Sequence, residues 1–158
     1  MLEQHTIVGH ALLRVSGISA RTLRKWVRSG RLKPAEEAET VDESVFAVVP
    51  EALAIATAAC MRGRGLPRDV AGRALDVLLG LDDMDVRLAF ASHRRYLLVS
   101  GRVVSDGLVD EVEVQRIFAT DGESMRQLGL FLLAIDVHQL YHNLMATIGC
   151  RDEAGGAP

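Results

Sequence analysis

The stretch TIVGHALLRVSGISARTLRKWVRSGRLKP, residues 6–34, decides the fold. Its apolar residues recur at helical spacing from Thr6 to Val15, which predicts a first helix there. A serine and a glycine then interrupt the pattern. Ser19 is placed to cap a second helix over 20–29, and Gly30 ends it. We therefore expect two short helices joined by a tight turn, the arrangement of a helix-turn-helix.

The second helix carries one basic face. At 100° per residue its cations fall on one side and its packing residues on the other: Arg21, Arg24, Lys25 and Arg28 against Leu23, Trp26 and Val27. Surfaces of simple solvated helices normally mix signs of charge, because like charges one turn apart repel. A bound polyanion would relieve that repulsion, so the pattern predicts a DNA-reading helix. The alternative is an ordinary helical hairpin with a basic face.

Charge is distributed unevenly along the 158 residues, whose formal net charge is −3. Residues 1–34 hold seven basic residues and one acid, a sum of +6, and the remaining 124 hold 11 basic and 20 acidic residues, a sum of −9. This asymmetry predicts a polyanion-binding patch on an acidic body. Two cysteines fit a reducing compartment, and the absence of a long uncharged apolar run predicts no membrane span. We expect a cytoplasmic location.

The next segments continue the first module. A polar, acidic loop at 35–44 precedes a short strand over Val45–Val49, and helices follow over Glu51–Met61 and from Pro67 to about Leu81. Residues 81–84 read as a linker. The expected domains are a DNA-binding domain over 1–80 and a regulatory or dimerisation module over 85–150.

The second half has a different texture. A β-hairpin is predicted over 95–104, and alternation at Val112, Val114 and Ile117 suggests a further strand. A long apolar helix is expected over 123–148, followed by a disordered tail at 151–158. The predicted fold class is mostly α (α+β): an N-terminal winged helix-turn-helix, a small hairpin and a long C-terminal helix.

That C-terminal helix is expected to be apolar on two faces. One face carries Met125, Leu128, Leu132 and Ile135, and the other carries Leu130, Leu133, Val137, Leu140, Leu144 and Ile148. Burial on both sides favours core packing together with a homodimer interface through 123–148. A monomer with a fully buried core helix is the alternative.

Other chemistry-bearing residues suggest neither an enzyme nor a cofactor site. His138 and His142 have a spacing that can bind a metal, but no carboxylate joins them, so we interpret them as solvated or interface residues. Cys60 and Cys150 lie in unlike surroundings and form no clustered thiolate site. Nucleophile, nucleotide-loop and Walker patterns are missing from the sequence.

Residues 6–34 resemble the winged helix-turn-helix of MerR-type transcriptional regulators. The matching pieces are Val15-Ser16-Gly17-Ile18-Ser19, Arg21-Thr22-Leu23-Arg24 and Ser29-Gly30-Arg31-Leu32-Lys33-Pro34, and the resemblance continues over 46–75. It implies that members of this kind dimerise on inverted-repeat operators. It further implies that Arg21, Thr22, Arg24 and Lys25 face the groove, that Arg28, Arg31 and Lys33 contact phosphates, and that Ser19 belongs to the DNA-binding set. The acidic residues of 36–43 are not expected to touch phosphate.

The sequence thus predicts a sequence-specific DNA-binding bacterial transcriptional regulator that acts as a dimer on double-stranded DNA. The order of head, helical link and hairpin module, together with 88–101, also resembles antitoxin-like proteins of toxin–antitoxin pairs. That resemblance implies a protein partner, a toxin that the chain would neutralise while autoregulating its operon. A small-molecule-responsive repressor is a third possibility.

Overall fold

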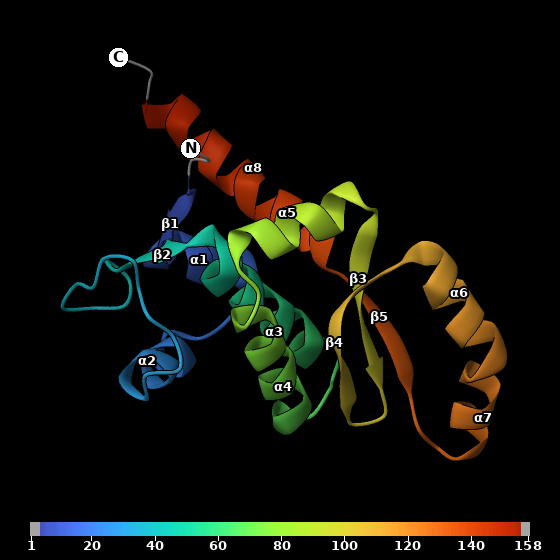
Figure 1. Ribbon diagram of the computed structural model, residues 1–158. Coiled ribbons are helices and arrows are strands. Elements are labelled where there is room, and N and C mark those ends of the chain that lie inside the picture. Colours follow the sequence, from blue (N-terminus) through green and yellow to red (C-terminus); the bar gives the residue numbers. More distant parts are fainter. Residues whose placement is uncertain (1–3, 156–158) are drawn as a thin grey trace.

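The computed structural model describes residues 4–155 (Figure 1). The chain is mostly helical and contains two small antiparallel sheets. The first half contains β1 (Thr6–Val8), α1 (Gly9–Ser16), α2 (Ala20–Arg28), β2 (Val45–Ala47), a π-helical turn η1 (Val48–Ala52), α3 (Leu53–Gly63) and α4 (Arg68–Leu79). The second half contains α5 (Asp83–Ala91), β3 (Arg94–Ser100), β4 (Val103–Asp110), α6 (Glu111–Thr120), α7 (Gly122–Gln127), β5 (Leu132–Asp136) and α8 (Val137–Gly155). The expectation of a mostly helical α+β protein is confirmed.

Local signals set the α1–α2 pair. Gly17 ends α1 in the left-handed region at φ 75°, where glycine meets no steric penalty. Ser19 caps α2, its Oγ accepting a hydrogen bond from the Thr22 N–H at 3.2 Å. The predicted helix over Thr6–Val15 begins three residues late, because Thr6–Val8 instead pairs with β2.

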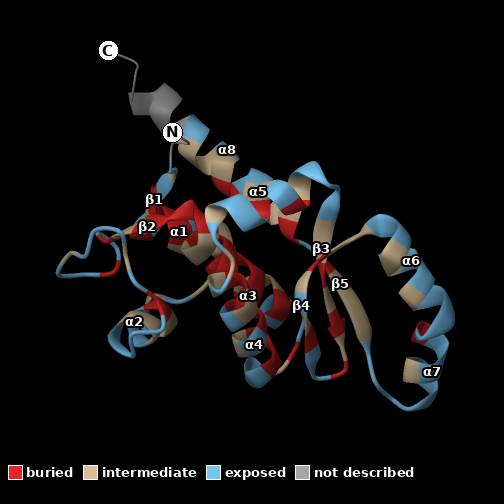
Figure 2. Cartoon of the chain, viewed as in Figure 1, coloured by how far each residue is buried: buried red, intermediate tan, exposed pale blue. Residues whose placement is uncertain are grey.

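The main core lies where α1, α3 and α4 meet. Its largest fully buried side chains include Leu12, Leu23, Phe46, Leu53, Ile55, Met61, Leu75 and Leu78. Figure 2 shows burial concentrated in these helices and in the strands, whereas α6 and α7 are mostly exposed or half-buried. One hydrophobic cluster runs from Ile7 in β1 to Leu144 in α8, so both halves of the chain share it.

The predicted linker at 81–84 opens a helix. Asp82 caps α5 by accepting from the Asp85 N–H at 2.7 Å, while the Asp85 carboxylate accepts from the Asp82 N–H at 3.1 Å. This reciprocal capping box explains why an acidic run begins a helix here. Val86 and Ala89 then bury α5 against the core.

The hairpin predicted over 95–104 exists and is longer, comprising β3 and β4 joined through Gly101 at φ 63°. β5 pairs antiparallel with the other side of β3, giving the order β4-β3-β5. One face of this sheet buries Leu97, Val99, Val104, Leu108 and Ile135.

Two expectations for the second half are wrong. The strand around 112–117 is helix α6, because the Asp110 side chain caps it by accepting from the Glu113 N–H at 2.8 Å. The long helix over 123–148 is divided into α7, β5 and α8, with Gly129 at φ 73° between α7 and β5. Of the tail predicted to be disordered, 151–155 continues α8, and 156–158 lies outside the described residues. Within residues 4–155, no helix combines the length and apolarity needed to span a membrane.

Glu51, in η1, carries an unfavourably placed carboxylate. Its Oε2 is buried and has no hydrogen-bond partner among the described residues, and burial raises the pKa of Glu51 above its usual value. The folded carboxyl therefore keeps its proton to a higher pH than the unfolded one, so the free energy of unfolding falls as the pH rises through that interval.

We expect Glu51→Gln to raise the free energy of unfolding at pH 7 by about 1 kcal/mol, because the neutral amide does not bury a charge. The gain should shrink towards pH 4 and below, as the carboxyl of the wild type becomes protonated in both states. Urea denaturation at several pH values measures this, with Glu43→Gln as a control at an exposed carboxylate of the acidic loop. A variant less stable than the wild type at pH 7 would contradict the assignment.

Candidate nucleic-acid interface

Helix α2 is anchored by one side and presents cations on the other. Leu23 is fully buried, and Trp26 and Val27 are half-buried against the core. The side chains of Arg21, Arg24, Lys25 and Arg28 are exposed, as the helical spacing predicts. A short helix held mainly by Leu23 can thus offer four charges without burying any of them.

A cleft of about 1080 Å³ separates α2 from the α3–α4 pair. Its basic lining comes from both sides: Arg21, Lys25 and Arg31 from α2 and the loop after it, and Arg62 and Arg68 from α3 and α4. Ser16, Ser19, Thr22 and Ser29 add hydroxyl groups. None of the described residues that line the cleft is acidic, although Asp76 pairs with Arg31 just outside the lining, so the lining itself carries a net positive charge.

The predicted DNA-binding residues divide into two groups. Ser19, Arg21, Thr22, Lys25 and Arg31 line the cleft, whereas Arg24, Arg28 and Lys33 are exposed outside its lining. The same short segment therefore supplies charge both to the cleft and to the outer surface of α2.

Arg31 is engaged in an ion pair. Its Nε and Nη2 each lie 2.9 Å from a different carboxylate oxygen of Asp76 in α4, and Nη2 also donates to the carbonyl oxygen of Gly72 at 2.8 Å. This bidentate contact ties the loop after α2 to α4 and so sets the separation of the two walls. Its positive charge is largely balanced by Asp76.

Arg62 and Arg68 were not predicted from the sequence. They belong to RGRGLPR, residues 62–68, where the arginines cluster in the turn between α3 and α4. That cluster was the available signal. Arg62 also steadies this turn, because its Nη1 donates to the Leu66 carbonyl oxygen at 2.7 Å.

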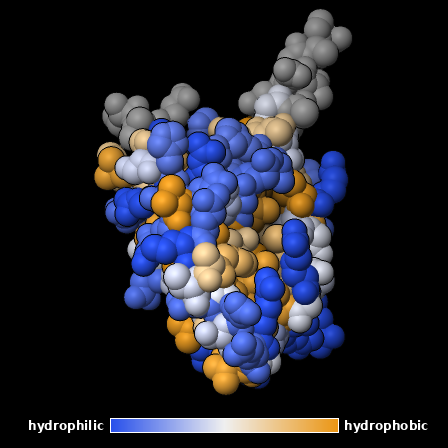
Figure 3. Space-filling view, turned by 90° about the vertical axis from the view of Figure 1, so that its right-hand side faces the viewer, coloured by the Kyte–Doolittle hydropathy of each residue, from blue (hydrophilic) through white to orange (hydrophobic). Residues whose placement is uncertain are grey.

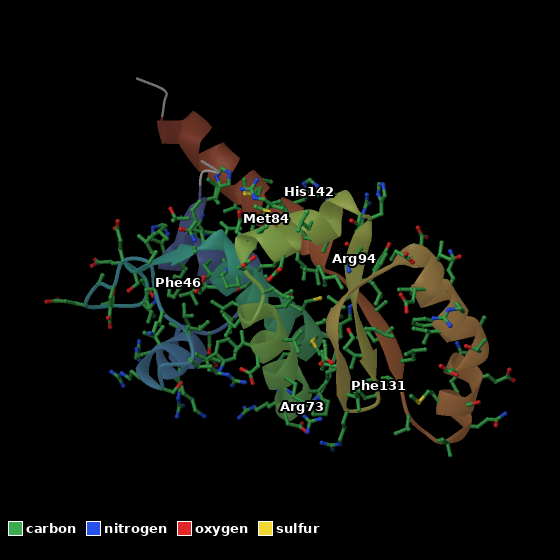
Figure 4. All side chains as sticks on the ribbon, in the orientation of Figure 1. Phe46, Arg73, Met84, Arg94, Phe131 and His142 are labelled. Atoms are coloured by element: carbon green, nitrogen blue, oxygen red, sulfur yellow. The ribbon has the colours of Figure 1, made fainter. Side chains whose placement is uncertain are left out.

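Basic residues continue from α4 to the β3–β4 turn. Arg73, labelled in Figure 4, donates from Nη1 to the carbonyl oxygen of Arg102 at 2.6 Å. Arg102 in turn pairs with Asp69 at 2.7 Å. These contacts dock the hairpin turn onto α4 and join the second half of the chain to the wall of the cleft.

The acidic loop lies apart from the cleft. Glu36 bridges to Val45 at its base, and Ser44 holds the turn by accepting from the Ala38 N–H at 3.0 Å. The carboxylates of Glu36, Glu37, Glu39, Asp42 and Glu43 are exposed, and none lines the cleft. The expectation that they avoid phosphate remains a prediction.

The other candidate residues do not form a second site of this kind. The His138 and His142 rings are 4.3 Å apart, and His138 packs edge-on to Phe90 at 4.7 Å. The pKa of His138 is lowered mainly by burial and, to a smaller extent, by repulsion from His142 and Arg95. The described residues contain no group of three side chains suited to a metal. Cys60 is half-buried in α3, and the Cys150 side chain lies outside the described residues.

The chain matches no model of a known protein family, and no curated protein matches it.

Proposed function

We propose that the protein is a sequence-specific DNA-binding regulator of bacterial transcription, with a MerR-like winged helix-turn-helix in its first 80 residues. The observation that carries the proposal is the cleft between α2 and α3–α4, which five basic side chains line without an acidic one. Arg31 is balanced by Asp76, and a polyanionic ligand would offset the repulsion among the other four cations of the lining.

Helix α2 would enter the major groove. The groove is about 12 Å wide and admits one α-helix, and arginine pairs with the O6 and N7 atoms of guanine. Arg24 and Arg28 stand one turn apart on the exposed side of α2, free of any ion pair found among the described residues. They are therefore the side chains best placed to reach base edges and adjacent phosphates.

The α3–α4 turn would contact the flanking backbone. Arg62 and Arg68 face α2 across the cleft, so a phosphate strand lying in the cleft would meet cations from both walls. Such contacts fix the register of a protein on the duplex but carry no sequence information. Base readout would then rest on α2 alone.

One such head offers few charges, so tight binding would need two heads on two half-sites. We accordingly propose a dimer acting on an inverted repeat. No cofactor enters this proposal.

Fluorescence anisotropy with labelled duplexes from the protein's own upstream region tests the proposal. We expect affinity to fall steeply between about 50 and 200 mM salt, because phosphate contacts release counterions. Arg24→Ala and Arg28→Ala should each weaken binding by roughly 1 to 3 kcal/mol or lower the salt slope by about one.

Arg94→Ala serves as the matched control, since Arg94 is equally exposed but starts β3, away from α2 (Figure 4). The proposal fails if the wild type shows no salt-sensitive binding, or if Arg24→Ala and Arg28→Ala both bind like the control.

A further inference from the structure

The two edges of the three-stranded sheet differ in what lies beside them. α4 packs beside β4, and Arg73 donates to the carbonyl oxygen of Arg102 at the hairpin turn. β5 forms the other edge, and within residues 4–155 its strand partner is β3 alone. No strand of the described residues therefore pairs with the outer side of β5.

The register shows which backbone groups are unpaired. The Gly101 N–H donates to the Phe131 carbonyl oxygen at 2.7 Å, and the β3–β5 register continues from there without a shift. Because hydrogen-bonded pairs alternate along an antiparallel ladder, the N–H and C=O groups of Leu132 and Ala134 point away from β3. Outside the strand ladders, no backbone hydrogen bond to either residue is found in the described part of the chain.

The sequence of this edge lacks the features that normally prevent strands from pairing. Residues 127–135 contain neither a charge nor a proline, and β5 has no bulge. Apolar side chains just before it are exposed: Leu128 by 74%, Leu130 by 44% and Phe131 by 40%. Figure 3 looks onto the side of the molecule where α6 and α7 lie in Figure 1, and it shows apolar patches among the hydrophilic ones. An open apolar edge of this kind is a template for a further strand.

We propose that β5 is a dimerisation strand, which pairs antiparallel with β5 of a second copy of this chain about a two-fold axis. Ala134 would lie opposite Ala134 of the second copy, and Leu132 opposite Asp136. In this register the residues whose backbone groups point outward meet each other. Two three-stranded sheets would thereby join into one of six strands.

Charge and symmetry favour a second copy over another occupant. Residues 35–158 sum to −9, so two copies repel wherever their acidic surfaces meet. The nine residues 127–135 carry no charge, so two such bodies can approach through them without this repulsion. An antiparallel strand is also its own partner under a two-fold axis, as an isologous interface requires. The exposed Leu128, Leu130 and Phe131 would add apolar area to a short ladder.

This inference does not rest on the proposed DNA binding, and it is tested without DNA. Sedimentation equilibrium of the full chain, from about 1 to 100 μM, should show a dimer. Ala134→Pro should raise the dimer Kd about 30-fold or more, because it removes both N–H groups at the axis. Its ring faces away from β3, so the β3–β5 ladder stays intact.

Leu130→Lys provides a second variant, at an exposed position before the strand, and should also weaken the dimer. Val103→Lys is the matched control, since Val103 is 65% exposed in β4 at the other edge, and it should leave the Kd unchanged. Far-UV circular dichroism checks the fold, and Leu130→Lys decides the question if Ala134→Pro unfolds. A wild type that is monomeric at the highest concentration overturns the proposal. The proposal is also overturned if Val103→Lys weakens the dimer as much as Ala134→Pro and Leu130→Lys do. It is overturned as well if every one of those two variants that folds has an unchanged Kd.

Discussion

Replacing Gly9 with alanine is expected to prevent the first half of the chain from folding. A Cβ atom on Gly9 would overlap the carbonyl oxygen of Val41 and lie 2.8 Å from its carbonyl carbon, which are backbone atoms that cannot rotate away. The same loop is held by two backbone bonds, from the Gly9 N–H to Ser44 at 2.7 Å and from the His10 N–H to Asp42 at 2.9 Å. Relief of the overlap would break both hydrogen bonds and separate α1 from the loop at 35–44 that precedes β2.

The cost should exceed about 4 kcal/mol, which is the range of substitutions that abolish a marginally stable fold. Urea denaturation followed by circular dichroism measures it. Gly63→Ala is the control, because a Cβ there meets nothing within 4 Å and the residue ends α3. That change should be neutral or stabilising by up to roughly 1 kcal/mol. A Gly9→Ala protein as stable as Gly63→Ala would show that the loop of Val41 is not fixed against α1.

Local sequence signals predict the first half of the fold well. The Ser19 cap, the turn at Gly17 and the start of α4 just after Pro67 act within a few residues, so they are legible without the rest of the chain. The error at Thr6–Val8 has a non-local cause. Its partner strand Val45–Ala47 lies some 40 residues later, and the pattern of Ile7 and Val8 suits a helix or a strand equally.

The second half was predicted less well, because its secondary structure depends more on long-range strand pairing than on local sequence signals. The run LLAID of β5 has no period that separates a buried strand from a helix, and only pairing with β3, more than 30 residues earlier, decides it. For α6, the cap at Asp110 outweighs the alternation at Val112 and Val114. The homodimer interface expected through one helix over 123–148 cannot exist in that form, since no such helix forms.

The candidate site shows the same division between local and long-range information. The basic face of α2 follows from its helical spacing and could be read from the sequence. For the opposite wall, the cluster RGRGLPR shows the arginines, but only the packing of α3 and α4 brings Arg62 and Arg68 to the cleft. The pairing of Arg31 with Asp76, 45 residues away, was equally out of reach.

The strongest test of the proposed function is the double variant Arg21→Glu with Lys25→Glu. Both side chains line the cleft and are exposed, and each change replaces a cation by an anion where a phosphate would lie. Each head loses two contacts and gains two repulsions, so we expect DNA affinity to fall more than about 100-fold and the salt slope to decrease.

Its effect on stability should have the opposite sign, which separates lost binding from lost folding. The new carboxylates would lie one helical turn from Arg24 and Arg28, and the first of them near the positive end of α2. Attraction between the new carboxylates and Arg24 and Arg28 should stabilise the helix by a few tenths of a kcal/mol, whereas the helix-dipole gain at position 21 is offset at position 25 in the last turn. Thermal unfolding at low salt measures this gain.

The matched control is Arg94→Glu with Arg116→Glu, two exposed arginines of the second half. It changes the net charge by the same amount, so any loss of affinity common to both proteins reports the overall charge and not the cleft. We expect the control to lose less than about tenfold, because charges beyond a Debye length of about 8 Å are largely screened at physiological salt. Equal losses in the two proteins would remove the cleft from the binding site, whereas a loss confined to Arg21→Glu with Lys25→Glu, in a protein at least as stable as the wild type, would assign the contact to α2.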